Sequence, residues 1–279
     1  MLKTIILLTG NAHQQHALAA LLREHNRALA FRGAVTREEL LAIAPEVLHN
    51  ARLIAFTTGV VVPQAVLEEL GHGAYNFHPG PPDYPGWAPA HFALYDGTTT
   101  FGATAHVMAA RVDSGPIVGV EPFVIPGGVD VRGLEQLAFV RLARLFWRMA
   151  RDIAREADPL PTLPVEWSGT RSTRRMYADM CDIPPDVDAS ELSRRICAFH
   201  DDFRGIPLTV TLHGIRFQLA TAGTRTVNQI QPKPQALRSE ATVQHPLHAK
   251  AIGELAVVVA PGLDPEWSCD RAAFGEVAE

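Results

Sequence analysis

The sequence contains few cysteines, no long apolar run and no excess of basic residues. Its three cysteines, Cys181, Cys197 and Cys269, are too few and too scattered for a disulfide framework or a paired-cysteine metal site. The apolar run at residues 4–8 is too short for the core of a signal peptide or for a membrane span. These absences favour inert buried thiols in a reducing compartment, and we expect the protein in the cytoplasm and away from membranes.

The charge balance also excludes a class of function. With 25 Lys and Arg against 30 Asp and Glu, the formal net charge is −5. Such a chain lacks the basic surface that concentrates a protein on nucleic acid, so we expect no general nucleic-acid binding and only a local site for any polyanion. At 279 residues and 47% hydrophobic, the chain is long enough for one large domain with a smaller one attached.

The first 125 residues alternate between short apolar runs and amphipathic segments. This alternation predicts a Rossmann-like α/β fold, with a largely parallel sheet and flanking helices, in which ligands bind at the carboxyl ends of strands. The expected strands are residues 4–8, 27–31, 53–58 and 73–77, and the expected helices are residues 12–25, 37–44 (disturbed by Pro45) and 63–70.

Two strand ends carry polar side chains suited to catalysis. Asn76 and His78 close one apolar run and open a loop rich in proline and glycine, NFHPGPPDYPG, at residues 76–86. A second run, FGATAHVM at residues 101–108, leads into a loop that holds Asp113. The pattern therefore predicts that two strands bring an amide, an imidazole and a carboxylate to their loop ends.

In order and spacing, these segments resemble the formyltransferase family that uses 10-formyltetrahydrofolate. The resemblance covers residues 2–125, and the N-x-H and D-x-G motif residues of that family fall on Asn76, His78 and Asp113. It implies that these three are catalytic, that no metal is needed and that 10-formyltetrahydrofolate is the formyl donor. It also implies a donor-binding set: Thr58, Gly59, Val60, Val62, Leu67, Met108, Arg111 and Val112.

Several polar residues beside these motifs have alternative interpretations. His106 lies on the strand before the Asp113 loop, where it either supports the wall of the site or takes part in formyl transfer. The TGNAHQQ turn, with Asn11 and His13, is either a plain structural turn or a loop that contacts the acceptor, and Tyr84 is a further candidate contact. A zinc site among the histidines is disfavoured, because no H-x-x-x-H pair or H-E-x-x-H sequence occurs in this region.

After residue 125 the sequence is less informative. Residues 129–158 predict a long helix with arginines at spacings of three and four, which we interpret as a solvent-facing surface, with a polyphosphate contact as the alternative. The predicted organisation is a catalytic domain at 1–157, a linker at 158–180 and a small α+β, β-rich domain at 181–279. This tail holds a helix capped by Asp188, a hairpin turning at His213 and Gly214, and an apolar strand at 251–261.

The predicted function is transfer of a formyl group to a primary amine of a small molecule. The loop HPGPPDYPG is similar to that of the sugar-nucleotide N-formyltransferases, so the preferred acceptor is a nucleotide-linked amino sugar. A hydrolase that releases formate from the same folate, a methionyl-tRNA formyltransferase and a non-catalytic folate- or nucleotide-binding module remain alternatives. A homodimer is left open.

Overall fold

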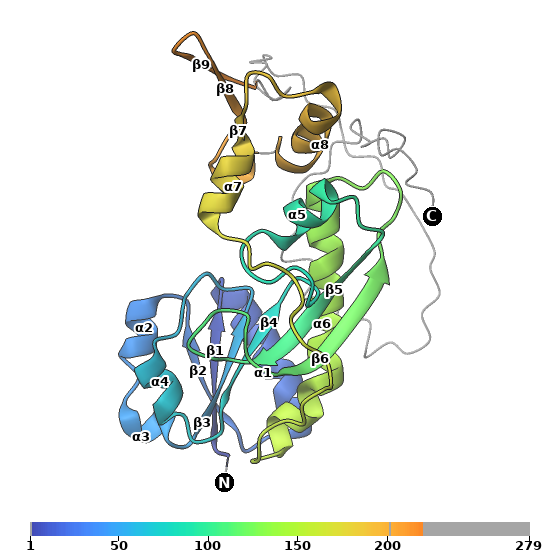
Figure 1. Cartoon of the computed structure of the whole chain (residues 1–279). Helices are drawn as coiled ribbons and strands as arrows, with labels where there is room; N and C mark the ends of the chain where they lie inside the picture. The colour runs from blue at the N-terminus through green and yellow to red at the C-terminus, as the bar shows by residue number, and fades with distance from the viewer. Residues whose placement is uncertain (1, 201, 220–279) are drawn as a thin grey trace, which may run out of the picture.

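A computed structural model describes residues 2–200 and 202–219 of the chain. Its centre is a six-stranded sheet in the order β2-β1-β3-β4-β5-β6 (Figure 1). Strands β1 to β4 pair in parallel, whereas β5 is antiparallel to both β4 and β6. The strands are β1 (Thr4–Thr9), β2 (Ala30–Ala34), β3 (Ala51–Phe56), β4 (Ala74–His78), β5 (Thr100–Val107) and β6 (Ile117–Val124).

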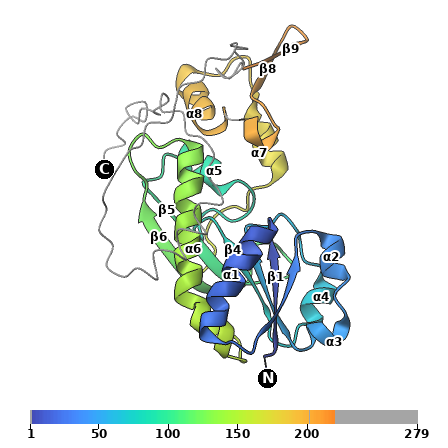
Figure 2. The ribbon, with the colours of Figure 1, turned by 180° about the vertical axis from the view of Figure 1, so that it is seen from behind.

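Helices cover the two faces of this sheet unequally. One face packs against α1 (Ala12–His25) and the long α6 (Val131–Arg155), which lie in front of the sheet in Figure 2. The other face is covered over β1 and β3 by three short helices, α2 (Arg37–Leu41), α3 (Pro45–Leu48) and α4 (Gln64–Glu69). An apolar cluster fills each interface, as expected for a sheet whose parallel strands are buried on both sides.

The alternating α/β class predicted from the sequence is confirmed, with local shifts. The helix predicted at residues 12–25 is α1, and its first amide groups are capped by Asn11. The second strand begins three residues later than expected, at Ala30. Pro45 does not merely disturb a helix: it begins α3, since proline at a first helical position sacrifices no hydrogen bond.

The arginines of α6 are mostly committed to the protein itself. Arg144 and Arg148 pair with the buried Glu121 of β6, and Arg141 lies over the ring of Phe123. Arg155 donates to the carbonyl oxygen of His25. Their role in the described structure is therefore to fasten α6 to β6 and α1. No helix in residues 2–200 and 202–219 is long and apolar enough to cross a membrane.

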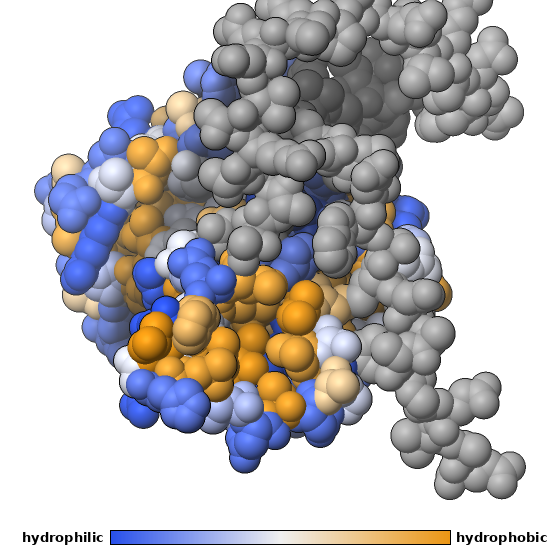
Figure 3. Space-filling view, turned by 90° about the horizontal axis from the view of Figure 1, so that it is seen from above, coloured by the Kyte–Doolittle hydropathy of each residue, from blue (hydrophilic) through white to orange (hydrophobic). Residues whose placement is uncertain are grey.

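Beyond α6, a smaller unit packs on α5 (Pro89–Tyr95) through a cluster that includes Tyr177 and Phe199. The hairpin turns as predicted at His213 and Gly214, both with positive φ. Asp188 caps α8 through the amide of Glu191. When the molecule is seen from above, apolar residues form a patch at the lower centre of the view (Figure 3). The unit contains α7 (Arg174–Cys181), β7 (Asp182–Ile183), α8 (Ala189–Phe199), a 3-10 turn (Asp202–Arg204), β8 (Thr209–Leu212) and β9 (Ile215–Gln218).

Two predictions about the tail reach past this unit. The apolar strand expected at 251–261 and Cys269 lie outside the described residues. Cys181 is a free thiol, and its burial raises its pKa to about 12, which matches the inert role expected for it.

A buried arginine joins the sheet to the end of α6. Arg52 of β3 is fully buried, and its guanidinium donates to the carbonyl oxygens of His72, Ile153 and Asp158 at 2.8 to 3.1 Å. The carbonyl groups of Ile153 and Asp158 lie at and beyond the carboxyl end of α6, where they have no hydrogen-bond partner within the helix, and Arg52 supplies that partner. Arg52 thus connects β3 by hydrogen bonds to the turn before β4 and to the segment that leaves α6.

We expect Arg52→Met to lower the free energy of unfolding by about 3 kcal/mol, because three buried or partly buried carbonyl groups lose a charged donor. Chemical denaturation measures this change. Arg151→Met is the matched control, since Arg151 is exposed on α6 and its loss should change stability by less than about 0.5 kcal/mol. Equal effects of the two substitutions on stability would contradict the proposed stabilising role of Arg52.

Candidate functional site

The register of β4 and β5 brings two of the predicted residues together. Tyr75 and Phe77 point into the core beneath α6, so Asn76 and His78 point to the opposite face of the sheet. Asn76 pairs directly with His106 across the antiparallel strands. The amide Nδ2 of Asn76 lies 3.1 Å from Nε2 of His106, while Nδ1 of His106 donates to the carbonyl oxygen of Val107 over 2.8 Å.

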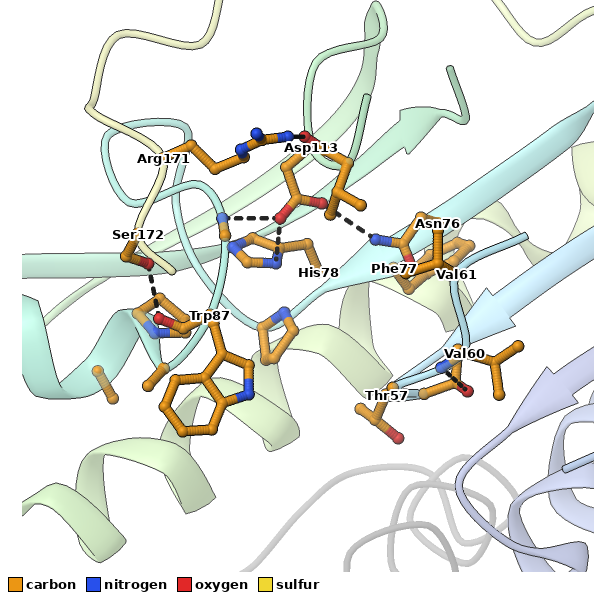
Figure 4. A pocket seen from close by; sticks show the side chains of 18 of the residues that line it. Thr57, Val60, Val61, Asn76, Phe77, His78, Trp87, Asp113, Arg171 and Ser172 are labelled. Carbon is orange, nitrogen blue, oxygen red and sulfur yellow. Dashed lines mark hydrogen bonds and ion pairs between the residues drawn. The ribbon is translucent and has the colours of Figure 1, made fainter. Parts of the chain in front are cut away.

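Asp113 closes this group from the loop after β5. Because β5 runs opposite to β4, its carboxyl end lies beside the start of β4, and the loop has to return over the sheet to reach the site. One carboxylate oxygen, Oδ1, lies 3.3 Å from Asn76 Nδ2 and 3.1 Å from His106 Nε2. The other, Oδ2, accepts from the amide of Gly86 at 2.8 Å and lies 3.4 Å from His78 Nδ1 (Figure 4).

The geometry corrects one detail of the sequence analysis. The three side chains were expected at strand ends, but Asn76 is the central residue of β4, and only His78 is its last residue. Asp113 sits in the loop with φ of 47°, a left-handed conformation that aspartate and asparagine adopt more readily than most residues. The amide, imidazole and carboxylate still meet as predicted.

His78 is held at both ring nitrogens. Its Nε2 donates to the carbonyl oxygen of Tyr84 at 3.0 Å, which leaves Nδ1 directed at the Asp113 carboxylate. The ring also fits closely against the following loop: a side chain at Gly80 would place its Cβ 2.5 Å from Nε2. His106 has the same pattern, with one nitrogen on a backbone carbonyl and the other on Asp113. The carboxylate therefore serves two imidazoles.

The ionisation of these groups follows from burial and charge. Burial lowers the pKa of His78 below its ordinary 6.5, and the nearby Asp113 carboxylate opposes this effect only in part. Burial alone would raise the pKa of Asp113, but the charge interaction with His78, the hydrogen bond and charge of His106 and the hydrogen bond of the Gly86 amide lower it to about 2. At neutral pH the site thus pairs an ionised carboxylate with a neutral His78 that can accept a proton.

A cavity of about 930 Å³ opens onto this group beyond the carboxyl ends of β3 and β4. Its walls are the loop after β3 (residues 57–62), the loop before α5 (residues 86–90), the Asp113 loop, the first turns of α6 and a segment at residues 171–173. This volume lies within the range typical of small-molecule sites. Asn76, His78, His106 and Asp113 are part of the lining of this cavity.

Most of the predicted site residues line this cavity. They are Thr58, Gly59, Val60, Val62, Asn76, His78, His106, Met108, Arg111, Val112 and Asp113. His106 touches both Asn76 and Asp113 and is therefore a member of this polar group.

Four candidates lie outside the cavity lining. Leu67 packs against the core under α4. Asn11 caps α1, His13 is exposed, and the Gln14 side chain accepts from the amide of Gly10. Contact of the TGNAHQQ turn with an acceptor stays a prediction. Tyr84 contributes through its backbone: its carbonyl holds His78, whereas its ring packs on Phe101.

The sequence did not single out several residues that shape the site. Gly86, with φ of 98°, supplies the amide that binds Asp113, and glycine in a DYPGW loop is a signal that could have indicated it. Arg132, Glu135 and Arg204 line the cavity far from the motifs in sequence. Arg171 and Ser172 come from the segment interpreted as a linker, where no local pattern marks them.

In the described residues, no group of three or more histidine, cysteine, aspartate or glutamate side chains is arranged to hold a metal ion. The polar group around Asp113 is instead satisfied by hydrogen bonds among its own members and the backbone.

Solved structures show the same fold. A sugar N-formyltransferase from Shewanella superimposes with a TM-score of 0.64 at 14% identity, over 79% of this chain and 98% of that one. An N-formyltransferase from Helicobacter canadensis, solved with folinic acid and dTDP-3-aminofucose, gives a TM-score of 0.54 at 16% identity, over 77% and 85% of the two chains. The fold is therefore that of the N-formyltransferases.

The sequence comparison finds a similar family for the first part of the chain. Residues 5–136 match the family described as formyl transferase. Methionyl-tRNA formyltransferase of Listeria monocytogenes is 38% identical over 82 residues, which are 29% of this chain and 25% of that protein. The match thus spans about a quarter of the length of this curated relative.

Proposed function

We propose that this protein transfers the formyl group of 10-formyltetrahydrofolate to a primary amine. The observation that carries the proposal is the group of Asn76, His78 and Asp113 on the wall of a cavity large enough for a small-molecule donor and acceptor. The formyl transferase family of residues 5–136 and the folinic acid present with the Helicobacter canadensis enzyme support this choice of donor.

The two loops beside the polar group fit a flat, partly apolar donor. Val61 and Val112 are exposed by 62% and 42%, although both belong to the cavity wall. A side chain at Gly59 would meet no atom within 4 Å, so the backbone of this loop borders open space. Exposed apolar side chains and accessible backbone groups are suited to a ring system that needs both stacking and hydrogen bonds.

The mechanism uses the residues in distinct roles. The bound donor supplies a formyl group on nitrogen, and the acceptor amine forms a new C–N bond to its carbon. Asn76 Nδ2 donates to the oxyanion that develops on the formyl oxygen. His78 takes the proton of the attacking amine and returns it to the leaving folate nitrogen as the old C–N bond breaks. Asp113 stabilises the transient imidazolium, and the Gly86 amide keeps Asp113 in place.

The preferred acceptor is a nucleotide-linked amino sugar. Arg132, Arg171 and Arg204 lie along the cavity wall, and a diphosphate is the small-molecule group that such guanidinium groups bind best. The nucleotide sugar present with the Helicobacter canadensis enzyme supports the same class.

A second acceptor class has its own support. The relatives identified by sequence include methionyl-tRNA formyltransferases, which favours an aminoacyl-tRNA acceptor. Against it, residues 181–279 contain 13 Asp or Glu and nine Lys or Arg, a poor surface for the many phosphate contacts of tRNA.

Calorimetry with 5-formyltetrahydrofolate, a stable analogue of the donor, tests the first step. We expect binding that does not change when a chelator is present, and absence of binding up to millimolar analogue would contradict the proposal.

Purified protein with 10-formyltetrahydrofolate is then assayed against amino-sugar nucleotides, glycinamide ribonucleotide and methionyl-tRNA. Formylated sugar nucleotide supports the preferred acceptor, formylated tRNA supports the second class, and formate released without any formylated amine identifies a hydrolase.

A further inference from the structure

A segment after α6 binds the two loops that build the polar site. Residues 163–173, here called the strap, run over β5 and β6 on the face of the sheet where α2, α3 and α4 cover only β1 and β3 (Figure 1). The amide of Leu163 donates to the carbonyl oxygen of Ile117 at 2.7 Å, and the amide of Ser168 donates to that of Pro82 at 3.2 Å. The strap thus contacts both β6, directly after the Asp113 loop, and the loop that follows His78.

The contact is closest where the strap passes Gly86. Ser172 and Gly86 form a parallel β-bridge, and the Ser172 hydroxyl donates to the carbonyl oxygen of Trp87 at 2.6 Å. A side chain at Gly86 would place its Cβ 2.2 Å from the Ser172 carbonyl oxygen, and one at Gly169 would lie 1.6 Å from that of Asp83. Glycine is therefore required on each side of this contact. The same Gly86 holds the Asp113 carboxylate.

Trp167 is the strap residue that reaches the catalytic group. Its Nε1 donates to the carbonyl oxygen of Gly115, in the Asp113 loop, at 2.9 Å. Its ring lies 5.0 Å from the His106 ring at 86° and 5.9 Å from the His78 ring at 72°. Trp167 is not among the residues of the cavity wall. It can therefore act on the imidazoles while leaving the substrate-facing side of the site free.

We propose that Trp167 is a positioning residue of the formyl-transfer site, which fixes the Asp113 loop through Gly115 and shields the two imidazoles from water. This inference rests on the proposed function for its kinetic consequence. Its structural part, the coupling of Trp167 to His78 and His106, is independent of which amine is formylated. Trp167 differs from Asn76 and His78 because it needs no contact with either substrate.

The expected electrostatic effect has a definite sign. Burial lowers the pKa of His78, so water admitted after loss of the indole should raise it. The charged and titratable groups around His78 are Asp113, from the loop after β5, and His106, from β5. Arg171 of the strap is directed at the Val112 carbonyl beside them. A change at Trp167 removes none of these groups from the chain.

Two substitutions separate the contributions of Trp167. Trp167→Ala removes both the ring and the indole N–H donor. We expect kcat to fall about ten- to a hundredfold, which is the usual effect of displacing catalytic groups. The acid limb of the kcat–pH profile should move to higher pH, while KM for the donor changes little. Trp167→Phe keeps a ring but loses the hydrogen bond to Gly115, so kcat should fall about two- to tenfold with the acid limb unchanged.

Titration of the histidine ring resonances by NMR provides a readout that does not depend on activity. The pKa of His78 should rise in Trp167→Ala and stay unchanged in Trp147→Phe, a control in which a half-buried tryptophan of α6 is replaced away from the site. An unchanged pKa of His78 in Trp167→Ala would overturn the inference even if formyl transfer is confirmed. A raised pKa in a protein without transfer activity would support the coupling and contradict the proposed function.

Protein stability is controlled separately. If Trp167→Ala fails to fold, Trp167→Phe decides the matter: a kcat equal to that of Trp147→Phe overturns the inference, and a lower kcat at unchanged donor binding supports it. Binding of 5-formyltetrahydrofolate by each variant shows that the cavity is intact.

Discussion

His78→Asn should lower kcat for formyl transfer by about a hundredfold or more, the usual cost of losing a proton-transfer group. Asparagine retains a polar side chain of similar reach, but its amide cannot exchange a proton near neutral pH. The donor should still bind, because the loops at residues 57–62 and 108–112 are unchanged. Steady-state kinetics with the best acceptor and calorimetry with 5-formyltetrahydrofolate measure the two effects.

A histidine far from the cavity provides the control for this substitution. His213→Asn replaces the exposed histidine of the β8–β9 turn, whose φ of 50° asparagine tolerates well, and it should leave kcat unchanged. If His78→Asn retains near-normal turnover, then His78 has a structural role and the mechanism proposed for this site is wrong.

Asp113→Asn should produce a comparable loss of turnover, about a hundredfold, through a different route. The carboxylate that stabilises the imidazolium of His78 is removed, whereas the side-chain shape and the left-handed backbone at φ of 47° suit asparagine. Asp113 also raises the pKa of His78, so its loss leaves burial unopposed and lowers that pKa further. Donor affinity is expected to fall as well, since the same loop carries Arg111 and Val112.

The pH profile gives this prediction its sign. Activity requires neutral His78, so in the natural protein it should be lost as the pH falls through a His78 pKa that lies below 6.5. In Asp113→Asn the acid limb should move to lower pH, opposite to the shift expected for Trp167→Ala. An acid limb that moves to higher pH, or one at the same position, would show that Asp113 does not set the charge of His78. Asp188→Asn at the exposed cap of α8 is the matched control.

The sheet and the three motif residues could be predicted from sequence because both depend on local patterns. The apolar runs and the helix between residues 12 and 25 have a clear period. Asn76 and His78 lead directly into a loop of unusual composition, and Asp113 lies in a second loop. The direction of β5 could not be predicted in this way, since an alternating run is compatible with either orientation. That direction places His106 opposite Asn76 and makes it a second partner of Asp113.

Other site residues were missed because their roles arise only from tertiary contacts. Ser172 acts through the carbonyl oxygens of Pro85 and Trp87, and Trp167 through that of Gly115. Prolines and small residues around them are typical of a linker, so composition favoured a domain boundary there. Conversely, Asn11 and His13 follow a strand in the position of a ligand loop, but the Gln14 side chain fills the space next to Gly10.

The path of the strap has a consequence for how this domain could be excised or fused. The family match ends at residue 136 and composition suggests a cut after residue 157, yet the bridge to Gly86 lies at Ser172. A fragment ending at either boundary would retain Asn76, His78 and Asp113 while losing the backbone that braces their loops. The smallest autonomous catalytic unit should therefore extend at least to Thr173, where α7 begins to be capped.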